Sequence, residues 1–408
     1  MHYLYVEPHV IVLSDKNNFL FYDTIANNHL QVKRDPGNQK IITKLLKSNS
    51  NYGIRLSKTD LQIKSISCLI QDLKDNFMGD LLSLENHSSL PANFRPIANF
   101  LRSSDKVNNY SFSYGDDVLE HLYELNIYLN DFCDRSCQYC NHAYKQVRFC
   151  YKQHPNRNIS IDALKIIFHG IKNSSIKRLS FLGGNILNFE YLNVLFDFIG
   201  TSYGSKTTFY ININHVNENW HVIKKIPLNI KIGLLISEIY DIDIIADCIE
   251  QFKTMGYQLE VSIIVKNEKE VDLYSKLKYE FIKLLPIYTN DNIDFFQKNI
   301  YLEEEDILKT PNKLRHFHAK QFINYNFFGS LTITPSGDVF SSFYLKKLGN
   351  ITIESMPEII SREFKQKLAW NNVRSSFPCN DCIYQFLCPS PSNYEFAIGK
   401  PNLCRVKS

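Results

Sequence analysis

From about residue 123 onward, short apolar runs alternate with longer segments in which apolar residues recur every three or four positions. The short runs predict buried strands, and the longer segments predict amphipathic helices. Because strands alternating with helices build a parallel sheet with crossover helices, an α/β fold is expected here. Strands are expected near 124–130, 178–183, 207–213, 231–236, 259–265 and 285–289, and helices near 161–172, 190–199, 217–225, 241–255 and 270–283.

The first 80 residues follow a different pattern. The apolar runs Val10–Leu13 and Phe19–Tyr22 flank Asp15-Lys16-Asn17-Asn18, which predicts a hairpin with a short polar turn. Helices are expected over Ile41–Leu46 and Asp60–Phe77, and Asp60 is the expected N-cap of the second helix. Residues 84–116 are rich in Ser, Asn and Pro without a sustained period, so they are expected to form a linker.

Length and charge narrow the class of protein. At 408 residues the chain is expected to hold two or three domains. Its formal net charge of +4 is small for this length, so neither nucleic acid nor an anionic membrane is expected as a partner. No long apolar run appears, and the start lacks a basic region leading into an apolar core. A cytoplasmic protein without a membrane span is therefore expected.

Seven of the ten cysteines form two clusters that are separated by residues 141–378. Such clustering favours metal binding over a disulfide framework, which a large intracellular chain does not need. Cys68 and Cys248 lie in apolar helical patterns and are expected in the core. Cys150 is expected to be a bystander of the first cluster.

The first cluster is Cys133, Cys137 and Cys140, and it follows the alternating apolar run that ends at Leu129. The thiols are therefore expected on a loop at the carboxyl end of a strand. Three thiolates can hold three irons of a [4Fe-4S] cluster, which leaves the fourth iron open to a ligand from outside the protein. The alternatives are a zinc site with His142 as the fourth ligand, or three unrelated buried thiols.

The spacing C-x3-C-x2-C, with Tyr139 before the last cysteine, resembles the signature of radical S-adenosylmethionine (SAM) enzymes. The resemblance implies a partial (β/α)6 barrel and an open iron that chelates SAM. It also implies a reductant such as flavodoxin or ferredoxin, and a 5'-deoxyadenosyl radical that abstracts hydrogen. Gly183-Gly184-Asn185 stands where the family usually has Gly-Gly-Glu. By this resemblance Tyr139 packs near the adenine, Gly183, Gly184 and Asn185 line the methionine end, and Asn212 and Asn214 are candidates for the ribose.

The second cluster, Cys379-x2-Cys382-x5-Cys388 with Cys404, resembles the SPASM extension of peptide-modifying radical SAM enzymes. That family houses two auxiliary clusters. Serines stand where ligands of the first are expected, at Ser341, Ser342 and Ser392, whereas all four ligands of the second are present. The resemblance implies one auxiliary [4Fe-4S] cluster for electron transfer or structure, and a zinc site on the same thiolates is the alternative.

Two further resemblances bear on the substrate. The segment Cys388–Glu395 resembles the tail of bacterial SPASM peptide maturases that are encoded beside ATP-grasp ligases. The hairpin and two helices of residues 1–83 resemble the RiPP recognition element, a winged-helix module that binds the leader of a ribosomally made peptide by β-augmentation. A small α+β cap without a partner is the alternative for this domain.

Together these observations predict an enzyme that modifies a ribosomally synthesised peptide through hydrogen abstraction, giving a crosslink or a related change. An inactive peptide-binding companion of an active enzyme, or a zinc-stabilised binding module, are the competing hypotheses. The expected domains are the peptide-recognition domain (1–83), the linker (84–116), the radical SAM partial barrel (117–325) and the SPASM-type domain (326–408).

Overall fold

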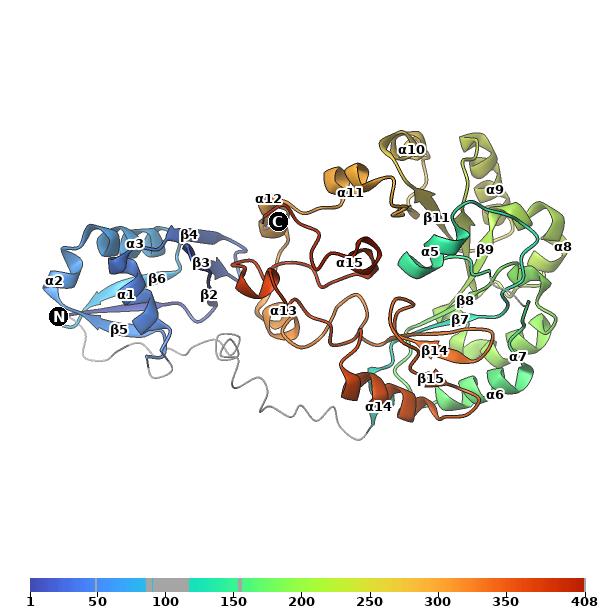
Figure 1. Ribbon diagram of the computed structural model, residues 1–408, viewed down its shortest axis with the longest axis horizontal. Helices are drawn as coiled ribbons and strands as arrows, with labels where there is room; N and C mark the ends of the chain where they lie inside the picture. Colours follow the sequence, from blue (N-terminus) through green and yellow to red (C-terminus); the bar gives the residue numbers. More distant parts are fainter. Residues whose placement is uncertain (48–49, 86–89, 91–116, 153–155, 407–408) are drawn as a thin grey trace.

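The computed structural model describes residues 1–47, 50–85, 90, 117–152 and 156–406 (Figure 1). The expected linker, residues 84–116, therefore lies outside the described residues except for 84, 85 and 90. Among the described residues, no helix is both long and apolar enough to cross a membrane.

The N-terminal part contains two three-stranded antiparallel sheets, in the orders β5-β1-β6 and β2-β3-β4. The predicted hairpin is confirmed as β2 and β3, which pair from Ser14 with Phe19 to Val10 with Asp23. Apolar residues from both sheets and the helices, such as Leu4, Phe21 and Leu69, share one buried core. The elements are β1 (His2–Val6), β2 (Val10–Ser14), β3 (Asn18–Asp23), β4 (His29–Lys33), α1 (Pro36–Leu45), β5 (Gly53–Leu56), α2 (Lys58–Leu61), α3 (Lys64–Asp75) and β6 (Gly79–Ser83).

The single helix expected over Asp60–Phe77 is in fact two helices, α2 and α3. Ile63 separates them because it is extended, with φ −77° and ψ 116°. Asp60 was expected to be an N-cap, but it is the third residue of α2. Its side chain accepts from the backbone N–H of Ser57 at 3.1 Å, and Ser57 Oγ accepts from its backbone N–H at 3.1 Å. This reciprocal capping box makes Ser57 the N-cap.

The rest of the chain is built on a nine-stranded sheet in the order β12-β11-β10-β9-β8-β7-β13-β14-β15. Neighbouring strands pair parallel from β12 to β13, whereas β13 with β14 and β14 with β15 pair antiparallel. The expected α/β fold is therefore confirmed for this part of the chain. The strands are β7 (Glu124–Tyr128), β8 (Arg178–Leu182), β9 (Thr207–Asn212), β10 (Lys231–Ile236), β11 (Leu259–Val265), β12 (Ile282–Pro286), β13 (Ser330–Ile333), β14 (Asp338–Phe340) and β15 (Gly349–Asn350).

Of the five helices expected in this part, three match α6, α7 and α9, and two differ; α5 and α11 to α15 were not predicted. The helix expected over 270–283 ends at Tyr274, because residues from Ile282 onward form the edge strand β12. The helix expected over 217–225 is only α8, preceded by the 3-10 turn η6 (Asn217–Asn219). The helices are α5 (Cys140–Gln146), α6 (Ile161–Gly170), α7 (Leu192–Tyr203), α8 (Trp220–Ile223), α9 (Ile242–Thr254), α10 (Glu268–Tyr274), α11 (Ile293–Asn299), α12 (Glu304–Lys309), α13 (Leu314–Ala319), α14 (Met356–Gln366) and α15 (Asn393–Ile398).

The two faces of the parallel sheet are covered differently. Leu125 and Ile127 of β7 belong to the same large core as the buried residues of α6, α7 and α9. Tyr128, Tyr210 and Ile264 point to the opposite face, where they pack with Cys140 and the segment that follows it. These three crossover helices therefore lie on one face, and the segment after Cys140 covers the other.

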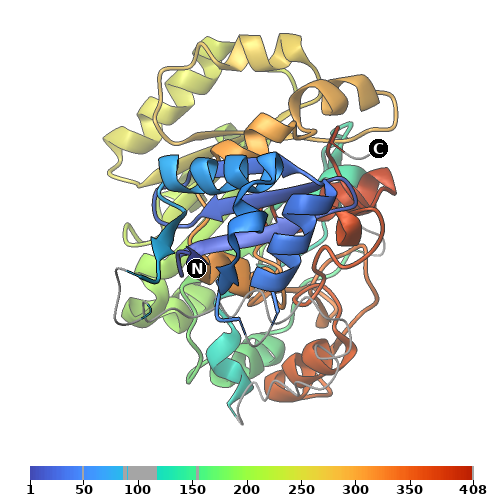
Figure 2. The same ribbon diagram turned by 90° about the vertical axis from the view of Figure 1, so that its left-hand side faces the viewer.

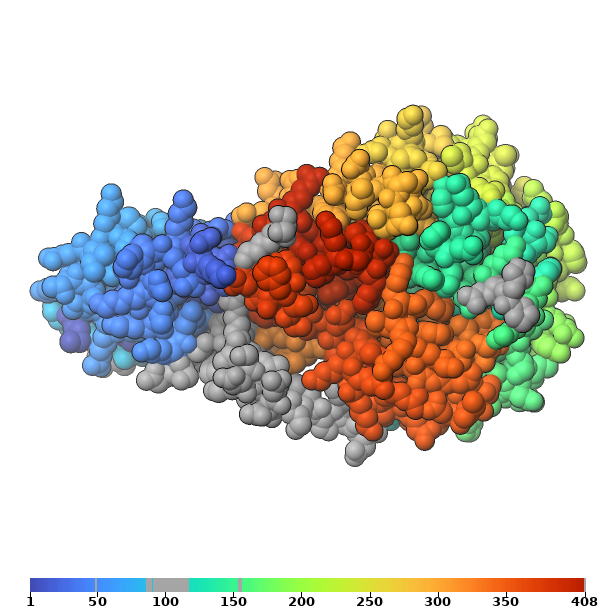
Figure 3. Space-filling view, viewed as in Figure 1, coloured from blue at the N-terminus to red at the C-terminus, as the bar shows by residue number. Residues whose placement is uncertain are grey.

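The N-terminal part contacts the C-terminal segment of the chain (Figures 1 and 3). Viewed from that side, its strands and helices stand in front of the rest of the molecule (Figure 2). Leu20 and Tyr22 of β3 are buried in one cluster with Cys382 and Cys388. Tyr384 Oη donates to Gln31 Oε1 at 2.9 Å across this contact.

Candidate metal centres

Cys133, Cys137 and Cys140 are here called the front thiols. The first two lie on the loop from β7 to α5, as the sequence predicts, and Cys140 is the first residue of α5. The carboxyl ends of neighbouring parallel strands meet at one edge of a sheet. Gly183 and Gly184 follow β8, and Asn212 ends β9 with Asn214 two residues beyond it, so all these predicted residues are brought to the same edge.

Nitrogen donors from the strand ends contact the front thiols. Asn214 Nδ2 lies 3.6 Å from Cys137 Sγ, and His215 Nε2 lies 3.5 Å from Cys133 Sγ. Asn212 Nδ2 donates to Ser237 Oγ at 3.0 Å and lies 3.5 Å from Cys150 Sγ. The sequence analysis missed His215 and Ser237. Their positions within two residues of the ends of predicted strands were the signal that could have found them.

The front thiols differ in acidity. Cys140 is hydrogen-bonded to Cys137, and this bond together with one from Ser237 lowers the pKa of Cys137 to about 6. The same bond and burial raise the pKa of Cys140. Burial also raises the pKa of Cys133 and lowers that of the neighbouring His215. Cys137 is therefore the front thiol most easily converted to the thiolate that metals bind.

The paired glycines let the cysteine loop pack against the end of β8. A side chain at Gly183 would collide with Asn130 Oδ1, and one at Gly184 would collide with the backbone oxygen of Phe132. Their backbone is already bonded, since Gly183 O accepts from Tyr151 N at 3.1 Å and Gly184 N donates to Asn130 O at 3.2 Å. The side chain of Asn185 is also engaged, because its Oδ1 accepts from Leu187 N at 3.2 Å.

Other predicted residues have mixed outcomes. Tyr139 pairs through its hydroxyl with the ammonium of Lys266, which directly follows β11. Cys150 is buried near the front thiols, and burial raises its pKa to about 12. Cys248 is buried as expected, but Cys68 is exposed on α3, where the core prediction was wrong because it lies outside the buried stripe of that helix.

The spacing of the thiols bears on which metal they suit. Among the described residues, the trio of ligand atoms that all lie within 4.8 Å of one another comes from Cys133, Asp134 and His215. Within that part of the chain, no three of the clustered cysteines meet this limit, and exposed His142 joins no such group. Two sulfurs on one zinc lie at most about 4.6 Å apart, twice the Zn–S distance of about 2.3 Å.

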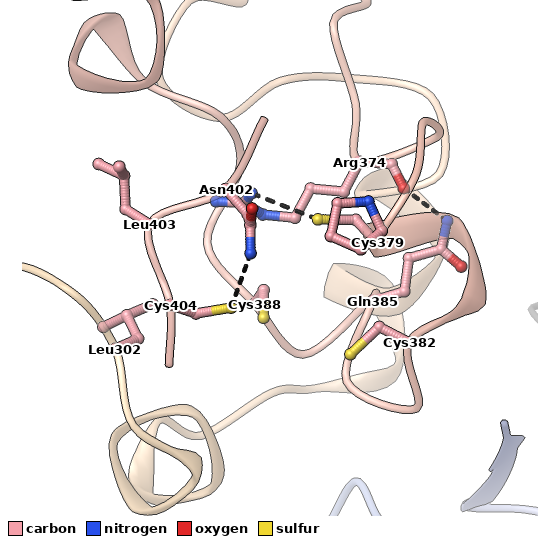
Figure 4. Close-up of a pocket in the computed structure, with 10 residues that line it drawn as sticks. Leu302, Arg374, Cys379, Cys382, Gln385, Cys388, Asn402, Leu403 and Cys404 are labelled. Carbon is pink, nitrogen blue, oxygen red and sulfur yellow. Dashed lines mark hydrogen bonds between the residues drawn. The ribbon is translucent and has the colours of Figure 1, made fainter. Parts of the chain in front are cut away.

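The four C-terminal cysteines, here called the rear thiols, line one small cavity (Figure 4). They are Cys379 at the start of the 3-10 turn η7 (Cys379–Asp381), Cys382 directly after it, Cys388, and Cys404, which bridges to Leu302. Arg374 Nη1 lies 3.8 Å from Cys379 Sγ, and Asn402 Nδ2 lies 3.0 Å from Cys404 Sγ (Figure 4). The cavity therefore joins four thiol ligands with N–H donors.

Arg374 supports this cavity from several directions. Its guanidinium pairs with Glu395 at 2.9 Å, and both side chains are 8% exposed. Its Nε also donates to Pro389 O at 2.6 Å. Burial raises the pKa of Cys388 to about 12, so this thiol would have to release a proton in order to bind a metal.

Oxygen-bearing side chains stand where the resemblance expects ligands of a further cluster. Ser342 Oγ donates to Asn393 Oδ1 at 2.8 Å, and Ser341 Oγ donates to Glu363 Oε2 at 2.8 Å. Ser392 is the N-cap of α15. Ser342 is thus bonded to the residue that follows Ser392, so these serine positions, far apart in sequence, lie near each other.

No family model matches the chain, and no curated protein matches it.

Proposed function

We propose that this protein is a radical SAM enzyme that modifies a ribosomally synthesised peptide. The observation that carries the proposal is the set of front thiols on one loop at the carboxyl ends of parallel strands, with N–H donors on two of the sulfurs. Hydrogen bonds to sulfur and partial burial are features of iron–sulfur sites.

Each part of the chain has a role in this proposal. Cys133, Cys137 and Cys140 would hold a [4Fe-4S] cluster, which together with SAM supplies a radical that abstracts hydrogen from the peptide. The six parallel strands β7 to β12, with their crossover helices on one face, support a partial (β/α)6 barrel. On the opposite face the rings of Tyr128, Tyr151 and Phe343 pack with their centroids within 6 Å of one another. In this proposal they would help to keep water away from the radical. The rear thiols would hold one auxiliary cluster, and a flavodoxin or ferredoxin would supply electrons.

The free edge of β4 supports leader binding. β4 ends its sheet, and the bonds from Arg34 N to Asn17 O and from Asp23 N to Asn28 O show which residues pair with β3. By alternation, the backbone groups of His29, Gln31 and Lys33 point away from β3. Side chains already bond two of these groups, since His29 N donates to Asn28 Oδ1 at 2.8 Å and Lys33 O accepts from Asn38 Nδ2 at 2.6 Å. Both backbone groups of Gln31 lie between them. Such an edge offers donors and acceptors to an added strand, so β4 is the surface on which a leader peptide would pair.

The test is anaerobic reconstitution with iron and sulfide, followed by SAM and dithionite. We expect 5'-deoxyadenosine, and we expect Cys133→Ala, Cys137→Ala and Cys140→Ala each to abolish it while the rear iron remains. Cys68→Ala is the matched control, because this exposed thiol lies on α3, away from both sites. A reduced wild-type protein that carries both clusters but leaves SAM intact contradicts the proposal.

Two competing functions each have an observation in their favour. The bonds already made by Gly183, Gly184 and Asn185 favour an inactive peptide-binding companion, which would release no 5'-deoxyadenosine in the same assay. The trio Cys133, Asp134 and His215 favours a zinc-stabilised module. Zinc without iron or sulfide after anaerobic purification would establish that alternative.

A further inference from the structure

One turn of the chain brings hydrogen-bond donors to two of the three front thiols. This is η5 (Ile213–His215), which directly follows β9. Asn214 Nδ2 lies 3.6 Å from Cys137 Sγ, and His215 Nε2 lies 3.5 Å from Cys133 Sγ. Because the two donors are adjacent residues, the placement of this turn decides the environment of both sulfurs.

The turn is braced against the cysteine loop. Asn212 caps η5, since its Oδ1 accepts from Asn214 N at 3.0 Å, and Asn219 Nδ2 donates to His215 O at 2.9 Å. Arg135, which lies between Cys133 and Cys137 in sequence, donates through Nη2 to Asn214 O at 3.3 Å. These hydrogen bonds therefore hold the turn that carries the two donors in a fixed position relative to the cysteine loop.

The environment of the His215 ring selects its role. The residue is 2% exposed, and among the described residues its Nδ1 has no hydrogen-bond partner, with Asp134 Oδ1 at 3.8 Å. A cysteine that binds metal is a thiolate. A lone pair on Nε2 would face that negative charge, so Nε2 has to carry hydrogen and donate it to the sulfur.

We propose that His215 and Asn214 are positioning residues that raise the reduction potential of the cluster held by the front thiols. The inference rests on the proposed function, because it takes an iron–sulfur cluster at Cys133, Cys137 and Cys140. Reduction adds negative charge to a cluster, and N–H groups aimed at its sulfurs stabilise the reduced form more than the oxidised one. Removing a donor therefore makes the cluster harder to reduce.

The test is a redox titration followed by electron paramagnetic resonance on the reconstituted full chain. The signal of the rear cluster alone is measured on the variant in which Cys133, Cys137 and Cys140 are all alanine. We expect His215→Leu and Asn214→Leu each to shift the front potential to more negative values. His215→Gln keeps an N–H donor of similar reach and should restore most of the wild-type potential. His221→Leu removes an exposed histidine on α8 and should cause no shift.

Each outcome decides a different question. Wild-type potential in His215→Leu and Asn214→Leu, with full front iron, overturns the inference and leaves the proposed function standing. Loss of front iron from His215→Leu and His215→Gln alike also overturns it, because the ring rather than its N–H would then be required. Wild-type protein without iron at the front thiols contradicts the proposed function itself.

Discussion

Arg374 and Glu395 form a buried ion pair beside the rear thiols, and the guanidinium also contacts Cys379 Sγ. Removing one partner of a buried pair leaves the other charge uncompensated, which costs about 3–5 kcal/mol. We expect Arg374→Ala to lower the free energy of unfolding by that amount and to release iron from the rear thiols. Urea unfolding, with iron content measured on the same samples, checks both effects.

The matched control is an exposed ion pair of similar length. Lys309 and Glu305 lie 3.1 Å apart on α12, with side chains 73% and 80% exposed. Solvent screens such a pair, so Lys309→Ala should cost at most about 1 kcal/mol and leave the iron in place. Equal costs for the two variants would show that the Arg374 pair is not the support proposed.

At the scale of residues, the sequence located the thiols but not the groups that surround them. Clustered cysteines can be recognised in the sequence, whereas His215, Ser237 and Arg374 do not belong to a recognisable sequence motif. Their contacts with sulfur arise from where β9 and β10 end and from how the chain folds back near residue 374. The glycine pair was predicted to approach a ligand. What the structure adds is that both glycines are needed for the close approach of the cysteine loop.

At the scale of elements, the capping box of α2 gives a prediction with a defined pH dependence. Hydrogen bonds from Ser57 lower the pKa of Asp60 from 3.8 to about 2. Because folding favours the ionised carboxylate, its contribution to stability is present above about pH 4 and is lost as the pH falls toward 2. We expect Ser57→Ala to raise the pKa of Asp60 and to cost about 1 kcal/mol at neutral pH.

Carboxyl NMR titration of Asp60 and urea unfolding at neutral and acid pH measure these effects. Ser67→Ala is the control, because Ser67 is exposed within α3 and only bonds back to Lys64 O at 3.0 Å. An unchanged pKa of Asp60 in Ser57→Ala would mean that the capping box does not set it.

The free edge of β4 gives a second prediction for an element. The N–H of Gln31 points away from β3, whereas that of Val32 points toward it. We expect the Gln31 amide to exchange hydrogen much faster than the Val32 amide. For the same reason Gln31→Pro should be tolerated, while Val32→Pro should lose a ladder bond and destabilise the N-terminal part.

Gln31→Ala is the matched control for this edge. It removes the side-chain bond from Tyr384 but keeps the backbone N–H. Thermal unfolding of the three variants separates the two contributions. If Gln31→Pro and Val32→Pro are equally destabilised, both N–H groups are used inside the sheet and β4 offers no open edge.

The elements themselves were predictable where their pattern was strong. The buried runs of β7 to β11 and the hairpin were found because apolar residues mark them clearly. The strands β1, β4, β5 and β6 were missed, and β4 illustrates why: its pattern His-Leu-Gln-Val-Lys is half exposed and short. The break between α2 and α3 was missed although Ser57 and Asp60 have the spacing of a capping box.

At the scale of the whole molecule, the N-terminal part and the rear thiols share one buried cluster. Ile11, Leu13, Leu20 and Tyr22 of the hairpin pack with Cys382, Ile383, Leu387 and Cys388. Asn312 N also donates to Tyr22 Oη at 3.0 Å. Neither the hairpin nor the cysteine pattern predicts this contact, because its residues are far apart in sequence. Tyr22 and Asn312 are separated by 290 positions, and Gln31 and Tyr384 by 353.

Metal at the rear thiols should therefore stabilise the contact with the N-terminal part. Metal binding contributes folding energy to the loops that supply its ligands, and two of these ligands lie in the shared cluster.

We expect the double variant Cys382→Ser, Cys388→Ser to lose the rear iron and to speed hydrogen exchange of β2, β3 and α13. Replacing the three front thiols with alanine should leave these segments protected, since none of them belongs to that cluster. The amides of β1 and α3 serve as the internal reference, because Leu4 and Leu69 on these elements belong to the other buried cluster. Unchanged exchange in β2 and β3 after rear iron is lost would mean that the apolar contact alone holds the N-terminal part in place.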